Sequence, residues 1–263
     1  MLHSSDVDGV SPVGGRRALV TGAASGIGRA IASHLCTRGA RVVISDLPGE
    51  RLHEVATALP QAVVIEADLS VADEVHQLAN EAADVDILVN NAGLQHVSRV
   101  EAFPDEQWQR LLDVMLTAPF LLTKDLIPHM YERGWGRIVN VASVHGLVAS
   151  PFKAAYVAAK HGLLGLTKTV ALEAAERASN VTVHAICPSY VRTPLVENQV
   201  DAQARTSMVD PSAVIDKVLL SRNAIKRLIE PQEVAEAVEF LCSDIAWSMT
   251  GTALTMDAGW LAH

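Results

Sequence analysis

Three side chains that could move a proton lie in the stretch SVHGLVASPFKAAYVAAK, residues 143–160. Ser143 precedes Tyr156 by thirteen residues, and Lys160 follows that tyrosine by four. Residues four apart on a helix share a face, so a Lys160 ammonium there would lower the Tyr156 pKa from about 10 towards neutrality. Ser143, at a strand end, could bind the reacting oxygen. The pattern predicts proton transfer to or from an alcohol, although YxxxK pairs are also common on exposed helix faces.

A glycine-rich turn upstream predicts a nucleotide site. TGAASGIG, residues 21–28, follows an apolar run and opens a helical pattern. Gly22 permits a tight turn, Gly26 lets the backbone approach a pyrophosphate, and Gly28 lets helix and strand pack closely. The N-terminus of the following helix would offer free N–H groups to the phosphates.

A carboxylate at the end of the second apolar run indicates which nucleotide is preferred. Asp46 lies eighteen residues after Gly28. A carboxylate at this place accepts hydrogen bonds from ribose hydroxyls and repels a 2′-phosphate. Ser45 and Leu47 beside it carry no positive charge, so we expect NAD rather than NADP. The alternative is a solvated aspartate that begins a turn.

Apolar runs and helical patterns alternate along the chain and must position these side chains. Seven runs are typical of buried strands: 16–21, 40–46, 62–68, 85–91, 136–143, 181–188 and 252–259. Helical patterns lie between them: 26–38, 50–59, 71–83, 105–133, 153–178 and 231–243. This alternation predicts an α/β fold, a doubly wound, mostly parallel seven-stranded sheet of Rossmann type with helices on both faces.

Two segments depart from that alternation. Residues 1–15 are expected to be a flexible tail before a single catalytic domain, 16–263. Residues 195–230 are polar and too long for a simple connection, so we expect a helical lid over the substrate. The alternative for this segment is a structural excursion with helices of its own.

Composition excludes several classes of function. Of the 263 residues 49% are hydrophobic, and the net charge of −9 argues against a nucleic-acid partner. Cys36, Cys187 and Cys242 lack metal-ligand spacing, so we expect free thiols in a reducing cytoplasm and no metal site. No apolar run is long enough for a membrane span, and the first fifteen residues do not read as a signal peptide.

The spacing GxxxGxG, together with Ser143, Tyr156 and Lys160, resembles the short-chain dehydrogenase/reductase family. The resemblance extends from about residue 15 to 262 and implies an oxidoreductase with those three residues as its catalytic set. It also implies the residues of the cofactor site: Thr21, Gly22, Ser25, Gly26, Ile27, Gly28, Asp46, Asp68, Leu69, Asn91, Ala92, Gly93, Tyr156, Lys160, Pro188, Val191 and Thr193.

Two positions depart from the family pattern. Ser189 follows Pro188 where glycine is usual, and Met115 stands where the family has a helical asparagine. In the family the backbone carbonyl of that asparagine anchors a water linked to the lysine, and Met115 retains the carbonyl, so we expect activity to persist. Pro119 should disturb helical hydrogen bonding nearby.

Polar side chains around Tyr156 indicate an acidic substrate. Gln95, His145 and Lys153 lie near strand carboxyl ends, where open α/β sheets bind ligands, and fixed positive charge suits a carboxylate. The alternatives without a role in binding are a loop cap for Gln95, a structural histidine for His145 and a surface lysine for Lys153.

Four stretches resemble more closely the branch of the family that oxidises (R)-3-hydroxybutyrate to acetoacetate, a reaction of ketone body metabolism: NAGLQHV, ASVHGLVASPFKAAYVAAKHG, PSYVRTPLVENQ and DAGWLA. In that branch, the positions of Gln95, His145, Lys153 and Gln199 bind the carboxylate, and those of Tyr190 and Trp260 enclose the methyl end. Tyr190 is a departure, because tryptophan is often found there. Gln199 could instead be a solvated lid residue, and Trp260 plain packing.

Two other functions stay open. The chain could act on a different alcohol or on a 3-oxoacyl substrate, or it could be a non-catalytic NAD-binding protein. The helical patterns at 105–133 and 153–178 carry more apolar surface than one sheet face needs, and in the family such helices pair, so we expect a homotetramer.

Overall fold

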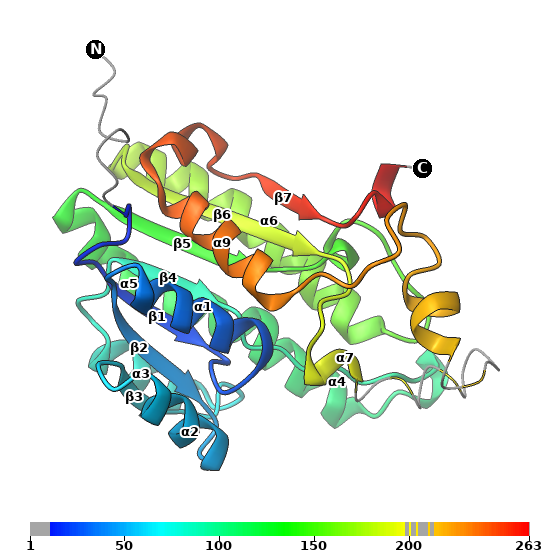
Figure 1. Cartoon of the computed structure of the whole chain (residues 1–263). Helices are drawn as coiled ribbons and strands as arrows, with labels where there is room; N and C mark the ends of the chain where they lie inside the picture. The colour runs from blue at the N-terminus through cyan, green and yellow to red at the C-terminus, as the bar shows by residue number, and fades with distance from the viewer. Residues whose placement is uncertain (1–10, 198–199, 201–203, 205–209, 211–212, 263) are drawn as a thin grey trace.

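The computed structural model describes residues 11–197, 200, 204, 210 and 213–262, within which seven strands form one sheet (Figure 1). The strand order is β3-β2-β1-β4-β5-β6-β7, and all six pairings are parallel. The strands are β1 (Arg17–Thr21), β2 (Arg41–Asp46), β3 (Val63–Glu66), β4 (Ile87–Asn90), β5 (Gly136–Val141), β6 (Val181–Pro188) and β7 (Ala253–Met256). The chain runs outward from β1 to β3 and then returns to β4, so the expected doubly wound sheet is confirmed.

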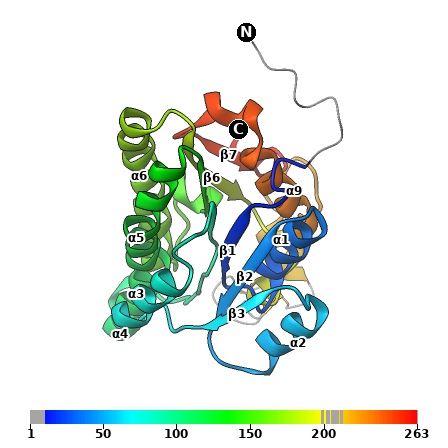
Figure 2. The same cartoon turned by 90° about the vertical axis from the view of Figure 1, so that its left-hand side faces the viewer.

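Helices cover both faces of the sheet, as Figure 2 shows. One face carries α1 (Gly26–Thr37), α2 (Glu50–Ala58) and α9 (Pro231–Cys242). The other carries α3 (Ala72–Glu81), α4 (Asp105–Leu112), α5 (Ala118–Arg133) and α6 (Ala154–Arg177). In the part of the chain that the structure describes, no helix is both long and apolar enough to span a membrane.

The central strands are apolar on both sides because both faces are covered. Every residue of β5 and of β6 is buried. On β1, Leu19 joins the core under α3 and α5, while Val20 joins the core under α1 and α9. These two apolar layers hold the carboxyl ends of the strands in a fixed row, and the polar side chains that follow each strand meet there.

The segment expected as one helix over 105–133 is two helices joined by a π-helical turn, Asp113–Thr117. The Ala118 N–H bonds to the Asp113 carbonyl five residues back. Pro119 has no N–H to offer the Met115 carbonyl, and the helix widens just before it. The predicted disturbance near Pro119 is confirmed.

Residues 11–15, expected to belong to a flexible tail, pack against the domain. Val13 is fully buried in the core under α1 and α9. The Ser11 hydroxyl donates to Glu239 of α9 at 2.9 Å. Residues 11–15 therefore pack as part of the domain, and residues 1–10 lie outside the described part.

The described part of the expected lid contains α7 (Pro194–Glu197) and a π-helical turn, Ile215–Leu219. A bridge between Val191 and Ile229 brings the two ends of the segment together. Gln199 lies outside the described residues.

Candidate active site

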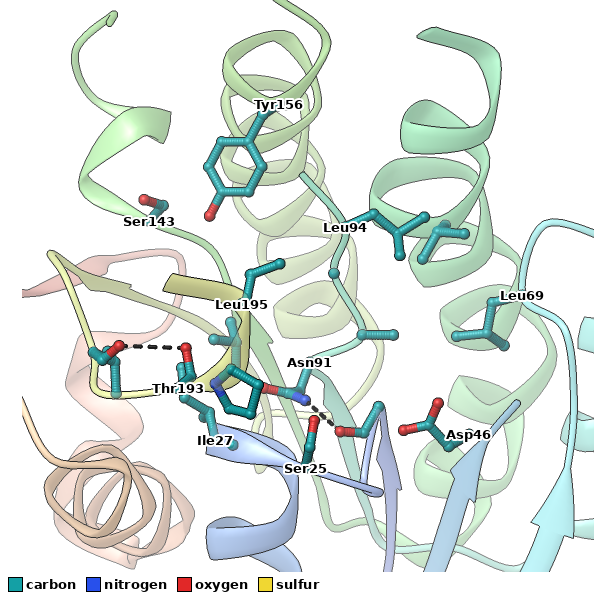
Figure 3. Close-up of a pocket in the computed structure, with 18 of the residues that line it drawn as sticks. Ser25, Ile27, Asp46, Leu69, Asn91, Leu94, Ser143, Tyr156, Thr193 and Leu195 are labelled. Atoms are coloured by element: carbon teal, nitrogen blue, oxygen red, sulfur yellow. Dashed lines mark hydrogen bonds between the residues drawn. The ribbon is translucent and has the colours of Figure 1, made fainter. Parts of the chain in front are cut away.

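The larger of two adjoining cavities follows the carboxyl ends of the strands and has about 1190 Å³ of empty space, part of which is open to solvent (Figure 3). Most of the predicted cofactor residues line it: Gly22, Ser25, Gly26, Ile27, Asp46, Asp68, Leu69, Asn91, Ala92, Gly93, Tyr156, Lys160, Pro188, Val191 and Thr193. Thr21 and Gly28, also predicted, are not in its lining. Both support the residues that line the cavity, Thr21 by hydrogen bonds and Gly28 by close packing.

Thr21 and Asn91 join the ends of β1 and β4. The Thr21 hydroxyl oxygen accepts hydrogen bonds from the backbone N–H groups of Asn91 at 3.0 Å and Ala92 at 3.2 Å. In return the Asn91 side-chain amide donates to the carbonyls of Thr21 at 2.9 Å and Gly22 at 3.2 Å. The side chains of Thr21 and Asn91 therefore hold the start of the glycine turn against the end of β4.

The glycine turn packs as closely as it does only because Gly26 and Gly28 lack side chains. A Cβ on Gly28 would lie 2.1 Å from the Gly22 carbonyl oxygen, and one on Gly26, at φ +51°, would lie 3.0 Å from Thr193. Helix α1 starts here, and its N-cap residue Ser25 makes no side-chain capping bond. Ser25, Gly26 and Ile27 line the cavity, so this helix end offers N–H groups without a helical partner, which fits a dinucleotide.

Two carboxylates stand on the far side of this cavity. Asp46 ends β2 and accepts backbone hydrogen bonds from Ala24 and Leu47, both at 2.8 Å. Its carboxylate therefore helps to shape the glycine turn as well as the cavity wall. Asp68 is bonded to the Ser70 hydroxyl and N–H, which together lower its pKa.

Sequence reasoning missed several lining residues. Most are apolar side chains at strand or helix ends that look like ordinary core, such as Leu94 and Val114. Arg110 of α4 also lines the cavity. On an amphipathic helix it has no local signal that separates it from a solvated arginine.

The predicted catalytic residues come together where β5 ends and α6 begins. Ser143 follows β5, and its hydroxyl oxygen accepts the His145 N–H at 3.1 Å, which caps a short 3₁₀ turn. The Tyr156 hydroxyl points towards Ser143 (Figure 3). Lys160, one turn along α6, is buried, and its ammonium donates to the Val141 carbonyl at 2.7 Å.

The protonation of Tyr156 differs from the expectation. Burial raises the Tyr156 pKa above its ordinary value of 10, and the hydrogen bond with Ser143 opposes that rise. Burial also lowers the pKa of Lys160 to about 8. We expected Lys160 to lower the Tyr156 pKa, but the Lys160 ammonium lies 5.7 Å from the tyrosine ring centroid and binds Val141 instead, so desolvation dominates.

A smaller cavity, with about 360 Å³ of empty space that includes open solvent, adjoins the larger one. Ser143, Tyr156 and Ser189 line both cavities, as do Leu195 and Val196 of α7. The other lining residues are Gln95, His145, Lys153 and Tyr190. Trp260 is not in this lining; it stacks behind Tyr190, with ring centroids 5.8 Å apart.

Lys153 is a buried cation at the wall of the smaller cavity. It is 2% exposed, and burial lowers its pKa to about 8. No carboxylate forms an ion pair with it among the described residues, and its ammonium donates only to the Tyr190 hydroxyl, at 3.2 Å. A buried charge without a counterion is costly, so the cavity is suited to an anion.

His145 is a neutral donor or acceptor in the same wall. Burial, then the positive charges of Lys153 and His161, lower its pKa to about 3. Its Nε2 is buried and has no hydrogen-bond partner among the described residues. Gln95 lines the cavity too, although its side-chain oxygen accepts the His96 N–H at 3.0 Å. The cavity therefore combines one cation with neutral polar groups beside Ser143 and Tyr156.

Comparisons with known proteins agree with this geometry. A family profile described as short chain dehydrogenase matches residues 16–204. The D-beta-hydroxybutyrate dehydrogenase of Rhizobium meliloti (strain 1021) is 47% identical, covering 94% of this chain and 99% of that protein. The protein of that name from Cupriavidus necator is 41% identical, covering 95% and 99%.

Relatives with other names are also similar. The 3-oxoacyl-[acyl-carrier-protein] reductase of Rickettsia prowazekii is 34% identical, covering 94% of this chain and 97% of that protein. Among solved structures, a variant of actinorhodin polyketide ketoreductase with NADPH superposes with a TM-score of 0.89 at 34% identity, covering 95% of this chain and 98% of that one.

Proposed function

Because the chain belongs to the short-chain dehydrogenase family, whose members are oxidoreductases, we propose that it oxidises (R)-3-hydroxybutyrate to acetoacetate with NAD, reversibly. One observation carries the choice of substrate. Lys153 is a buried ammonium without a carboxylate partner among the described residues, and it lines the cavity that Ser143 and Tyr156 share. A short acid would supply the missing negative charge and place its hydroxyl near the tyrosine.

In the proposed reaction, the glycine turn, Asp46, Asn91 and Thr193 would hold a nicotinamide cofactor, which would supply the hydride chemistry. Tyr156 exchanges the proton of the substrate oxygen as general acid and base. Ser143 donates its hydroxyl hydrogen to that oxygen and limits the pose the substrate can take. Lys160 sits one helical turn from Tyr156 and contributes positive charge near the reacting centre.

The carboxylate end would be bound by Lys153, His145 and Gln95. Lys153 supplies the charge, and the other two supply neutral hydrogen bonds. Gln199 would join them from the lid, and Tyr190, with Trp260 stacked behind it, would close the remaining wall. Leu195 and Val196 of α7 line both cavities, which supports the lid proposal.

The raised Tyr156 pKa bears on the two directions of the reaction. At neutral pH the phenol holds its proton, so it is ready to protonate acetoacetate during reduction. Oxidation needs the deprotonated form, and that form becomes more abundant as the pH rises.

A preference for NAD over NADP is supported by Asp46 at the end of β2. A 2′-phosphate near this carboxylate would meet like charge, and no lysine or arginine flanks it. The solved relative with NADPH leaves this preference to be tested.

A 3-oxoacyl substrate is the main rival, because reductases of that type are also similar to the chain. In such a substrate the carboxyl group is a thioester and carries no charge for Lys153 to bind. A non-catalytic NAD-binding protein is the other rival, and intact Ser143, Tyr156 and Lys160 argue against it.

The proposal is tested by measuring NADH and NADPH formation with (R)- and (S)-3-hydroxybutyrate separately, each with NAD and with NADP. We expect turnover of the (R) acid with NAD. Comparable or faster turnover of a 3-hydroxyacyl thioester would favour the reductase alternative, and cofactor binding without any turnover would favour the non-catalytic one.

We also propose that the protein works as a cytoplasmic homotetramer. Large apolar side chains are exposed on α4, α5 and α6: Trp108 is 38%, Phe120 47% and Leu172 72% exposed. Light scattering coupled to size-exclusion chromatography tests the assembly.

A further inference from the structure

The Tyr190 hydroxyl makes a contact that enclosing a methyl group does not require. Its oxygen accepts a hydrogen bond from the Lys153 ammonium at 3.2 Å, and that ammonium lies 5.3 Å from the tyrosine ring centroid. Among the described residues Lys153 Nζ has no other hydrogen-bond acceptor. An unsubstituted ring would close an apolar wall equally well, so the hydroxyl has a separate role.

Neighbouring rings hold Tyr190 in place. Its ring stacks on Trp260, with centroids 5.8 Å apart and planes 16° from parallel. His145 meets Tyr190 edge-on at 6.3 Å and Trp260 edge-on at 5.2 Å. With Trp260 buried behind it, the phenol keeps its hydroxyl at the lining of the smaller cavity, beside Lys153.

Burial keeps the Tyr190 hydroxyl protonated at neutral pH. Burial, and then the nearby Tyr156, raise its pKa to about 12. A neutral phenol that accepts a hydrogen bond from Lys153 still has its own O–H to donate. The Lys153 ammonium has three N–H donors; one binds Tyr190, and two remain for a ligand.

We propose that Tyr190 is a carboxylate-binding residue: its oxygen orients the Lys153 ammonium, and its O–H donates to the same substrate carboxylate. This inference rests on the proposed function and gives Tyr190 a polar role at the acid end of the substrate instead of the methyl end. Tyr190 thereby adds a neutral donor to a site that has a single buried cation.

The first test is Tyr190→Phe, which removes only the hydroxyl, with Tyr131→Phe as the matched control. Tyr131 lies on α5, where its ring contacts Arg177, outside both cavities. Loss of a hydrogen bond to a charged group should raise KM for (R)-3-hydroxybutyrate roughly 10- to 100-fold, with kcat changed much less. Methyl 3-hydroxybutyrate, which has no carboxylate, should respond about equally in the variant and the wild type.

The pH profile separates a positioning role from a merely structural one. The titratable groups that line the cavity with Lys153 are His145, Tyr156 and Tyr190, and none of them is a carboxylate. Without the Tyr190 oxygen the ammonium loses its acceptor, so the Lys153 pKa should fall further. The alkaline limb of kcat/KM for the acid should therefore move to lower pH in Tyr190→Phe.

Acetoacetate binding, measured by calorimetry in the presence of NAD, distinguishes failure of this inference from failure of the proposed function. Weaker binding to Tyr190→Phe supports the inference even if (R)-3-hydroxybutyrate is not the physiological substrate. Equal binding and equal KM in variant and wild type overturn the inference alone. If the wild type does not bind acetoacetate, both proposals fall. Tyr190→Trp, which keeps a donor but no acceptor, is the second variant should Tyr190→Phe fold poorly.

Discussion

Replacing Lys153 with methionine should make the protein more stable and less able to bind a short acid. The side chain is 2% exposed, and burial lowers its pKa from 10.5 to about 8. That difference corresponds to roughly 3 kcal/mol of unfavourable burial at neutral pH. Loss of the hydrogen bond to Tyr190 returns about 1 kcal/mol, so a net gain of about 2 kcal/mol remains.

The stability gain has a defined pH window. Because the folded pKa lies below the unfolded one, the penalty is fully present below about pH 8 and disappears as the pH rises towards 10.5. A net gain of about 2 kcal/mol should raise Tm at pH 7 by roughly 4–8 °C, and the difference should shrink above pH 8. Thermal unfolding of wild type and variant across this range measures it.

The same substitution should raise KM for (R)-3-hydroxybutyrate roughly 30-fold or more, since a charge-assisted contact is lost, and far less for a neutral alcohol. Lys168→Met is the matched control, because Lys168 is an exposed lysine of the same helix, α6. A lower Tm in Lys153→Met with an unchanged control would refute the burial argument, and an unchanged KM would refute the carboxylate site.

Four further predictions concern the cofactor, the catalytic proton, the charge of Lys153 and the core. Asp46→Arg should shift the NAD/NADP ratio of kcat/KM towards NADP, and an unchanged ratio would remove the basis for the NAD preference. Tyr156→Phe should lower kcat by about 10²- to 10⁴-fold with little change in Tm. In the wild type, kcat/KM for the acid should fall above about pH 8, because Lys153 loses its proton there. His184 is fully buried in β6, and its pKa is lowered to about 4. The folded protein should therefore lose stability as the pH drops below about 6.5, because the unfolded chain binds a proton at this histidine first. His184→Gln should make the fall of Tm between about pH 6.5 and 4.5 less steep.

The sheet could be predicted from the sequence because burial on both faces leaves continuous apolar runs. β5 and β6, in which every residue is buried, are the clearest examples. The glycine turn could be predicted for a similar reason, since close contacts such as that between Gly28 and Gly22 exclude any side chain. Patterns that packing enforces at each residue are visible without a structure.

What the sequence could not provide was the electrostatic outcome of burial. The spacing of Tyr156 and Lys160 suggested a phenol made acidic by its neighbour, yet the ammonium binds the Val141 carbonyl and desolvation raises the tyrosine pKa. The hydrogen bond between Lys153 and Tyr190 joins residues 37 positions apart, so no local pattern could indicate it. Both effects depend on burial and on contacts between residues that are distant in the sequence.

The shared lining of the two cavities has a thermodynamic consequence. Ser143, Tyr156 and Ser189 face both spaces, so whatever fills the larger space becomes part of the wall of the smaller. The two occupants are therefore energetically coupled neighbours. If a bound nucleotide raises the affinity of the protein for the acid by some factor, the bound acid must raise the affinity for the nucleotide by the same factor. An affinity for the acid measured on the nucleotide-free protein would describe a different surface from the one that the proposed substrate meets when nucleotide is bound.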